Sequence, residues 1–144
     1  MISRILVAVD DSSAAFHAAD VAIALASEQR RALCAVTVLH DHALDERISA
    51  ASQRVAGRRS LAGNAALRHV QRRAEAAGIV IDTVQVSGSP AAEVLAETRR
   101  WEADLIVIAR ASGHGVGLPY VGVEAQRILE FAEVPVLVVP PPTP

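Results

Sequence analysis

Two short polar segments carry residue types with which a protein could hold a charged small molecule. The first is Asp10-Asp11-Ser12-Ser13, where a carboxylate could accept hydrogen bonds from a base or sugar and hydroxyls could cap a helix. The second is Ser112-Gly113-His114-Gly115-Val116-Gly117, whose glycines could let backbone amides surround an anion before a helix N-terminus. A plain helix cap and a flexible loop are the ordinary alternatives, and the residues alone leave them open.

Several catalytic chemistries lack the residues they need. All 14 basic residues are arginine, so a phosphate-binding or Schiff-base lysine is absent. Cys34 is the single cysteine and lies inside an apolar run, which predicts an inert core residue and suits a reducing compartment. Ser112 and His114 are too close in the chain to form a catalytic triad without an evident third partner. We therefore predict that the protein has no catalytic residues and is not an enzyme.

Two further polar clusters are better interpreted as ordinary surface. His40-Asp41-His42, with Asp45 and Glu46, contains metal-ligand residue types, but neighbouring residues without a compact second ligand pair seldom enclose an ion, so we predict no metal site. Seven arginines lie between positions 47 and 73 and could face phosphate or RNA. The formal net charge of −2 and the scarcity of aromatic residues favour a solvated helix face, and we expect no nucleic-acid partner.

Apolar runs alternate with helical segments along the chain. The runs predict buried strands at 4–9, 33–39, 79–86, 105–109 and 136–139. Helical periodicity predicts helices at 14–29, 45–77, 90–102 and 122–132. Near-continuous apolar strands separated by helices imply an α/β fold with a five-stranded, doubly wound parallel sheet and helices on both faces. Ligands of such sheets bind beyond the carboxyl ends of the strands, which is where both polar segments fall.

The 144 residues fit one domain over positions 1–144, with a proline-rich tail at 140–144. There is no apolar stretch of membrane-spanning length and no signal-peptide pattern at the start, so we expect a cytoplasmic protein without a membrane partner.

Five segments resemble, in order, the structural segments of one known family. They are Ile5–Asp10 with Ser12, Leu39-His40, Gly88–Leu95 with its Gly-x-Pro helix start, Ala103–Ile108 and Val134–Val139. On these residues the chain resembles the universal stress protein family over its whole length. The resemblance implies a Rossmann-like fold of the adenine-nucleotide α-hydrolase type. It also implies a non-enzymatic stress-response or regulatory role.

Members of this family that bind ATP or AMP resemble one another in a motif of Gly, two residues, Gly, nine residues, Gly, then Ser or Thr. Aligned backward from Pro135, this chain has Ala109 and Ser112 in place of the first two glycines. Gly122 matches the third glycine, and Val123 replaces the hydroxyl residue. The resemblance therefore implies a degenerate nucleotide-binding motif.

The rest of the implied pocket also departs from the family pattern. Asp41 replaces an apolar residue beside the adenine, Asp11 replaces a glycine beside the pocket aspartate, and Arg110 is the one nearby cation. The pocket positions carried over by resemblance are Asp10, Ser12, His40, Asp41, Ala109, Arg110, Ser112, Gly113, Gly115, Gly122 and Val123. We expect no cofactor, with weak binding of ATP or AMP through a shifted glycine loop as the alternative.

The last apolar run would be an exposed edge if the sheet stopped there. Family members use their final strand to form a symmetric dimer, so the resemblance implies a homodimer through Val136, Leu137, Val138 and Val139. The prolines at 140–142 would then end the strand pairing.

Overall fold

The computed structural model describes residues 2–40, 50–110 and 122–143, and of 50–56 only the backbone. Strands and helices alternate through these residues. In chain order they are β1 (Arg4–Ala8), α1 (Ser13–Gln29), β2 (Ala32–His40), α2 (Ala50–Ala76), β3 (Asp82–Gly88), α3 (Pro90–Arg100), β4 (Leu105–Ala109), α4 (Val123–Phe131) and β5 (Val136–Val139). All strand pairs are parallel, in the order β3-β2-β1-β4-β5. The predicted α/β fold with a five-stranded parallel sheet is confirmed.

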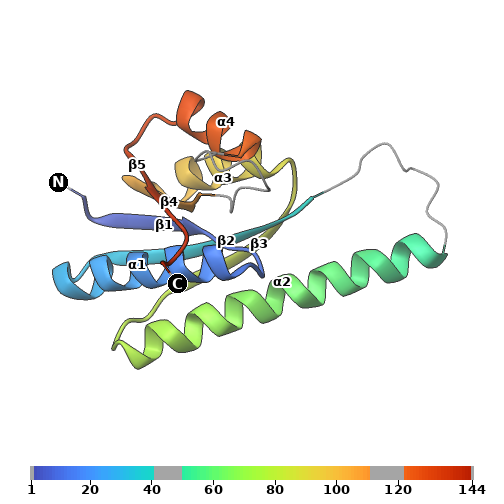
Figure 1. The fold of residues 1–144 in the computed structure, drawn as a ribbon, viewed down its shortest axis with the longest axis horizontal. Coiled ribbons are helices and arrows are strands. Elements are labelled where there is room, and N and C mark those ends of the chain that lie inside the picture. Colours follow the sequence, from blue (N-terminus) through green and yellow to red (C-terminus); the bar gives the residue numbers. More distant parts are fainter. Residues whose placement is uncertain (1, 41–49, 111–121, 144) are drawn as a thin grey trace.

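Helices cover both faces of this sheet. One buried cluster joins the sheet to α1 and α2, and a second joins its other face to α3 and α4. Figure 1 shows these pairs of helices on opposite sides of the strands. In β1, Ile5 and Val7 face the first cluster while Leu6 faces the second, because successive side chains of a strand point to opposite faces. β4 is therefore apolar at every position, and β1 is apolar from Ile5 to Ala8, as the sequence predicts for a doubly covered sheet.

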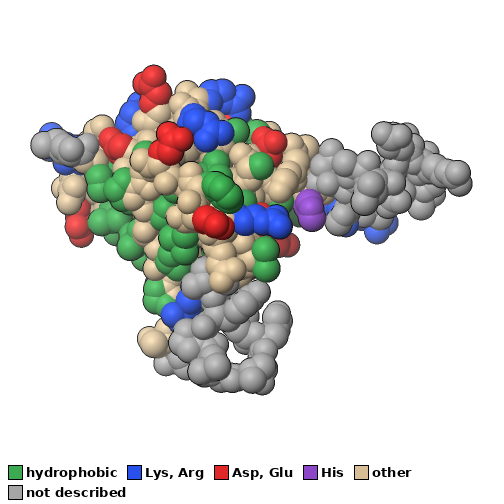
Figure 2. Space-filling model, turned by 90° about the horizontal axis from the view of Figure 1, so that it is seen from above, with side chains coloured by type: hydrophobic (Ala, Val, Ile, Leu, Met, Phe, Trp, Pro, Cys, Tyr) green, Lys and Arg blue, Asp and Glu red, His purple; other side chains and the backbone are tan. Residues whose placement is uncertain are grey.

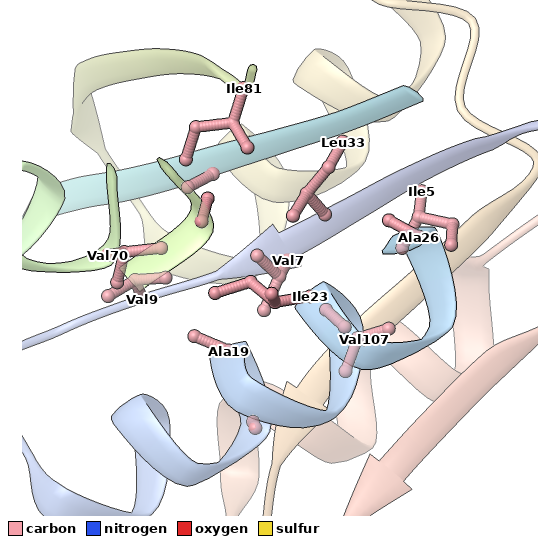
Figure 3. Packing of buried hydrophobic residues seen from close by; sticks show 14 of the residues in the cluster. Ile5, Val7, Val9, Ala19, Ile23, Ala26, Leu33, Val70, Ile81 and Val107 are labelled. Carbon is pink, nitrogen blue, oxygen red and sulfur yellow. The ribbon is translucent and has the colours of Figure 1, made fainter. Parts of the chain in front are cut away.

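Small residues let α1 approach the sheet closely. Its buried positions are Ala15, Ala18, Ala19, Ala22, Ile23 and Ala26. Five of these six residues are alanine, and Leu25 on the same helix is only partly buried. In Figure 3, the side chains of α1 lie against Val7 of β1 and Val107 of β4.

One strand begins later than the sequence predicts. The apolar run suggested a strand from Ile79, but β3 starts at Asp82. Gly78, with a φ of +79°, ends α2 in the left-handed conformation, and the Ile79 amide donates back to the Ala74 carbonyl over 2.9 Å. Ile79 therefore closes the helix end before strand pairing begins, Val80 is exposed, and Ile81 is buried in the core cluster that joins the sheet to α1 and α2.

A polar clamp secures the amino ends of β1 and β4. The Asp104 carboxylate accepts hydrogen bonds from the backbone amides of Ser3 and Arg4, the latter over 2.8 Å, and from the Ser3 hydroxyl. The Arg4 guanidinium lies 4.0 Å from the centre of the Trp101 ring, and its Nε donates to the Trp101 carbonyl. This clamp lies at the edge of the sheet opposite the carboxyl ends of the strands.

Candidate ligand site at the carboxyl edge of the sheet

The central strand β1 and its neighbour β4 are followed by helices that lie on opposite faces of the sheet. In open parallel sheets this reversal of winding is the usual place for a ligand. Hydrogen bonds from the Val9 amide to the Val36 carbonyl and from the Arg110 amide to the Val139 carbonyl, each 2.8 Å, extend the strand pairing to this edge. The structure thus brings Asp10, which follows β1, and Arg110, which follows β4, to the same edge of the sheet.

The turn after β1 is organised by its own side chains. Asp10 Oδ1 accepts a hydrogen bond from the Ser12 amide over 2.8 Å, and Ser12 Oγ accepts one from the Ala15 amide over 3.1 Å. Ser12 is therefore the N-cap of α1, which is the ordinary helix-cap alternative for this segment. Asp10 is exposed, and its second carboxylate oxygen forms no hydrogen bond or ion pair with another described residue, so it could accept a hydrogen bond from a ligand.

His40 lies at the outer side of this edge. It is the exposed last residue of β2 and pairs in register with Gly88 at the end of β3. Gly88 has a φ of +147°, and a Cβ there would lie 2.6 Å from Glu93 Oε1, so the position needs glycine. The segment after it begins α3 with Pro90 in the first turn, as the Gly-x-Pro pattern predicts. Asp41, expected beside it, lies outside the described residues.

The edge after β4 ends in two half-buried residues, Ala109 and Arg110, of which Ala109 pairs in register with Val139. The glycine-loop positions Ser112, Gly113 and Gly115 lie outside the described residues. The chain is described again at Gly122, which is the N-cap of α4 and makes no side-chain cap hydrogen bond.

Val123 is the first residue of α4, and 52% of its side chain is exposed. A helix N-terminus favours an anion through its free amides and its dipole. At this position, however, the side chain is an isopropyl group, which adds no hydrogen-bond donor to those amides. At Val123, α4 therefore offers an anion only a backbone amide.

Glu124 is a structural residue of this edge that sequence reasoning missed. Its Oε2 accepts a hydrogen bond from the Ala91 amide in the first turn of α3 over 2.9 Å, and its Oε1 lies 3.3 Å from Arg127 Nη1. Ser89, the N-cap of α3, makes no side-chain cap hydrogen bond, so the carboxylate from α4 satisfies a donor that α3 leaves open. No local signal could have found this pair, because its members are 33 residues apart.

Cys34 lies away from the site, within β2, and is buried. Burial and, to a smaller extent, the Asp82 charge raise the pKa of its thiol to about 11, against an opposing effect of Arg4. The thiol is therefore protonated at neutral pH, in keeping with the predicted core residue.

Of the cluster of metal-ligand residue types at 40–46, only His40 is described, because positions 41–49 lie outside the described residues. Elsewhere in the described chain, no group of three His, Cys, Asp or Glu side chains could hold a metal ion. Of the seven arginines, five are exposed on α2: Arg58, Arg59, Arg68, Arg72 and Arg73. Within the described ranges, no helix is both long enough and apolar enough to cross a membrane.

The sequence model of the universal stress protein family matches residues 1–140. The chain belongs to the universal stress protein family. It is 36% identical over 80 residues to a universal stress protein of Methanocaldococcus jannaschii, which covers 56% of this chain and 47% of that protein. The aligned part thus spans about half of that relative's length.

Solved universal stress proteins share the fold. UspA from Lactobacillus plantarum superposes with a TM-score of 0.83 at 23% identity, covering 96% of this chain and 97% of that one. A universal stress protein in complex with cAMP has a TM-score of 0.76 at 22% identity, covering 98% and 99% of the two chains. One from Archaeoglobus fulgidus, in complex with dAMP, has a TM-score of 0.69 at 17% identity, covering 96% and 99%. These likenesses establish the same arrangement of strands and helices.

Proposed function

We propose that this universal stress protein is a non-catalytic cytoplasmic stress-response or regulatory module whose adenine-nucleotide site has lost most of its phosphate-binding groups. The observation that carries the proposal is Val123 at the first position of α4, where nucleotide-binding members carry Ser or Thr. A hydroxyl there would donate to an anionic phosphate oxygen, and an isopropyl group cannot.

The expected loss of affinity follows from the strength of such a bond. A hydrogen bond to a charged group contributes about 1.5–3 kcal/mol, which corresponds to roughly a ten- to hundredfold change in affinity. Ala109 adds a Cβ at a position where the family motif has glycine. The exposed carboxylates of Asp10 and Asp11 lie at the same edge, and the chain has no lysine to offset them. Together these features disfavour a triphosphate.

A second candidate function is an ATP- or AMP-binding switch. It is supported by the Asp10 carboxylate, which the Ser12 amide orients and which keeps one oxygen for a ribose or base. The complexes of similar folds with cAMP and dAMP also support it. Arg110, whose backbone is held by β5, is the nearby cation that could offset the phosphate charge.

The test is thermal unfolding of the purified protein with and without millimolar ATP and Mg²⁺, followed by calorimetric titration. A ligand at 100 times its Kd stabilises the folded state by about 2.7 kcal/mol, which raises the Tm by several degrees. We expect no shift for the native chain. We expect Val123→Thr to tighten binding about ten- to hundredfold, and Ala109→Gly, Ser112→Gly and Val123→Thr combined to tighten it further.

Val123→Ala is the matched control, because it shortens the side chain without adding a hydroxyl and should leave ATP binding as weak as before. A low-micromolar Kd for ATP in the native chain would overturn the proposal and favour the switch.

The proposed module acts as a homodimer through β5. This strand is the outer one of the sheet next to β4, and an edge strand presents unpaired amides and carbonyls to a partner. Leu137 on β5 is 36% exposed, and Leu129 and Phe131 on the adjoining α4 are 44% and 63% exposed. Figure 2, seen from the side of α4, shows hydrophobic side chains gathered on part of this surface. A second copy pairing edge to edge would cover them.

A further inference from the structure

The outer side of α2 carries a row of exposed residues that the proposed function does not use. We call this row the α2 outer face. It consists of Arg58, Leu61, Ala65, Arg68 and Arg72, all exposed, with Leu61 69% exposed. Their spacing of three, four, three and four residues places them along one side of the helix, over a length of about 21 Å.

The opposite side of the same helix is the one that packs against the protein. Gly63, Leu67, Val70 and Ala74 are buried there. A Cβ at Gly63 would lie 3.2 Å from Leu39 Cδ2 and 3.3 Å from Thr37 Cγ2, which shows how closely this side meets β2. Because α2 is anchored by its inner side, its outer face is held rigidly toward solvent. Figure 1 shows α2 as the outermost element on its side, with its first turns extending past the strands.

Among the described residues, no carboxylate balances the charge of the outer face. Arg58, Arg68 and Arg72 form no hydrogen bond or ion pair with any residue that the structure describes. Arg73, one position from Arg72, is paired with Asp20 of α1. Arg73 thus lies on the flank of the helix, where it is paired, whereas the three arginines of the outer face are exposed to solvent.

Helix energetics alone would not select this pattern. Arg68 and Arg72 are four residues apart, and like charges at that spacing destabilise a helix by about 0.2–0.5 kcal/mol. Between positions 57 and 76 the sequence has a single acidic residue, Glu75. Leu61, in the same row, exposes apolar area beside Arg58. A face that repels itself and exposes a leucine is suited to a ligand that brings both negative charge and apolar surface.

We propose that the α2 outer face docks an acidic amphipathic segment of a partner protein. Carboxylates of that segment would pair with the row of arginines, and its apolar side chains would cover Leu61 and Ala65. RNA fits less well, because the face has no aromatic side chain for base stacking and the chain as a whole has a net charge of −2. A membrane fits less well, because Leu61 is the one large apolar side chain of the row and the inner side of α2 is already buried.

The test uses the full chain and a fluorescein-labelled synthetic peptide of about 15 residues, in which glutamates and leucines recur at helical spacing. Fluorescence anisotropy should show binding that weakens as the salt concentration rises. Arg68→Glu combined with Arg72→Glu should weaken it about tenfold or more, and Leu61→Ser about threefold. Arg99→Glu changes an exposed arginine of α3 on the other face of the sheet, and should leave the Kd within about twofold.

Every substituted position is exposed, so unchanged thermal unfolding should accompany the loss of binding. An absence of peptide binding would overturn the proposal, as would equal weakening by Arg99→Glu. Tighter binding of a single-stranded RNA or of anionic vesicles through the same arginines would also overturn it and assign the face to that partner. Because α2 and α4 lie on opposite faces of the sheet, the result does not depend on whether the protein binds nucleotide.

Discussion

The Glu124 carboxylate of α4 accepts a hydrogen bond from the Ala91 backbone amide of α3 over 2.9 Å. The contact joins the first turns of two helices that lie on the same face of the sheet. It places the negative charge of Glu124 at the positive N-terminal end of α3. Glu124 directly follows Val123, so the same contact also holds the first turn of α4. The position of α4 at the candidate site therefore depends on a side chain whose partner is in another helix.

We predict that Glu124→Ala lowers the free energy of unfolding by about 1–2 kcal/mol, because the Ala91 amide loses its acceptor and Arg127 loses its ion pair. Glu130→Ala, an exposed position on the same helix, should change it by less than about 0.5 kcal/mol. Urea denaturation of both variants checks this. Equal stabilities would show that the cap contributes nothing.

Two glycines of α2 should respond in opposite directions to the same change. Alanine at an exposed helix position is favoured over glycine by about 0.5–1 kcal/mol, and nothing lies within 4 Å of a Cβ at Gly57, so Gly57→Ala should stabilise the protein. A Cβ at Gly63 would lie 2.6 Å from Gln85 Oε1 and would crowd Leu39 and Thr37. We expect Gly63→Ala to be less stable than Gly57→Ala by about 1–2 kcal/mol.

Thermal and chemical unfolding give the free energies of unfolding of the two variants, and the difference between them tests how closely α2 packs against the sheet at Gly63. The Gln85 amide donates to Ser60 Oγ over 2.9 Å, so a shift of this side chain would also strain that hydrogen bond. If the two alanine variants were equally stable, α2 would not be held against β2 and β3 as described.

The Asp104 clamp should make stability depend on pH in acid. Partial burial raises the pKa of Asp104, but the hydrogen bonds from Arg4 and Ser3 together outweigh it and hold the pKa below the ordinary 3.8. A lowered pKa stabilises the folded state above pH 3.8, and this contribution is lost as the pH falls through the folded value.

We therefore expect Asp104→Asn to cost about 1–2 kcal/mol at neutral pH and progressively less as the pH falls below about 4. Urea unfolding of both proteins across this range provides the measurement. A difference that stayed constant with pH would mean that the carboxylate charge plays no part in the clamp.

The proposed dimer predicts an effect of charge on β5. Leu137→Arg places a cation at the centre of the strand that would pair across the twofold axis, and should convert a dimer to a monomer in light scattering. Val80→Arg makes the same kind of change at a position that is 91% exposed in the connection after α2, and should leave the dimer intact. A native chain that is monomeric at every accessible concentration would exclude this interface.

Much of the fold follows from the sequence because its signals are local. The apolar runs at 105–109 and 136–139 became β4 and β5 with the same bounds. For β4 the reason is that a strand buried on both faces must be apolar throughout. Ser12 was recognisable as a possible cap because its acceptor bonds an amide three residues away. The substitution by Val123 is likewise visible in the sequence, since it depends on one residue against a linear motif.

The tertiary structure decided what depends on residues distant in the chain. The strand order and the faces on which the helices pack bring Asp10, after β1, to the same edge of the sheet as Arg110, after β4, and no local sequence pattern predicts this. The hydrophobicity of Ile79 predicts a strand, but its amide donates a hydrogen bond to the Ala74 carbonyl, and β3 begins only at Asp82. The sequence alone suggests that Glu124 is a surface residue, but its carboxylate accepts a hydrogen bond from the Ala91 amide and so caps α3. Hydrophobic periodicity indicates which side chains are buried, whereas the hydrogen bonds of Ile79 and Glu124 depend on where the chain folds back on itself.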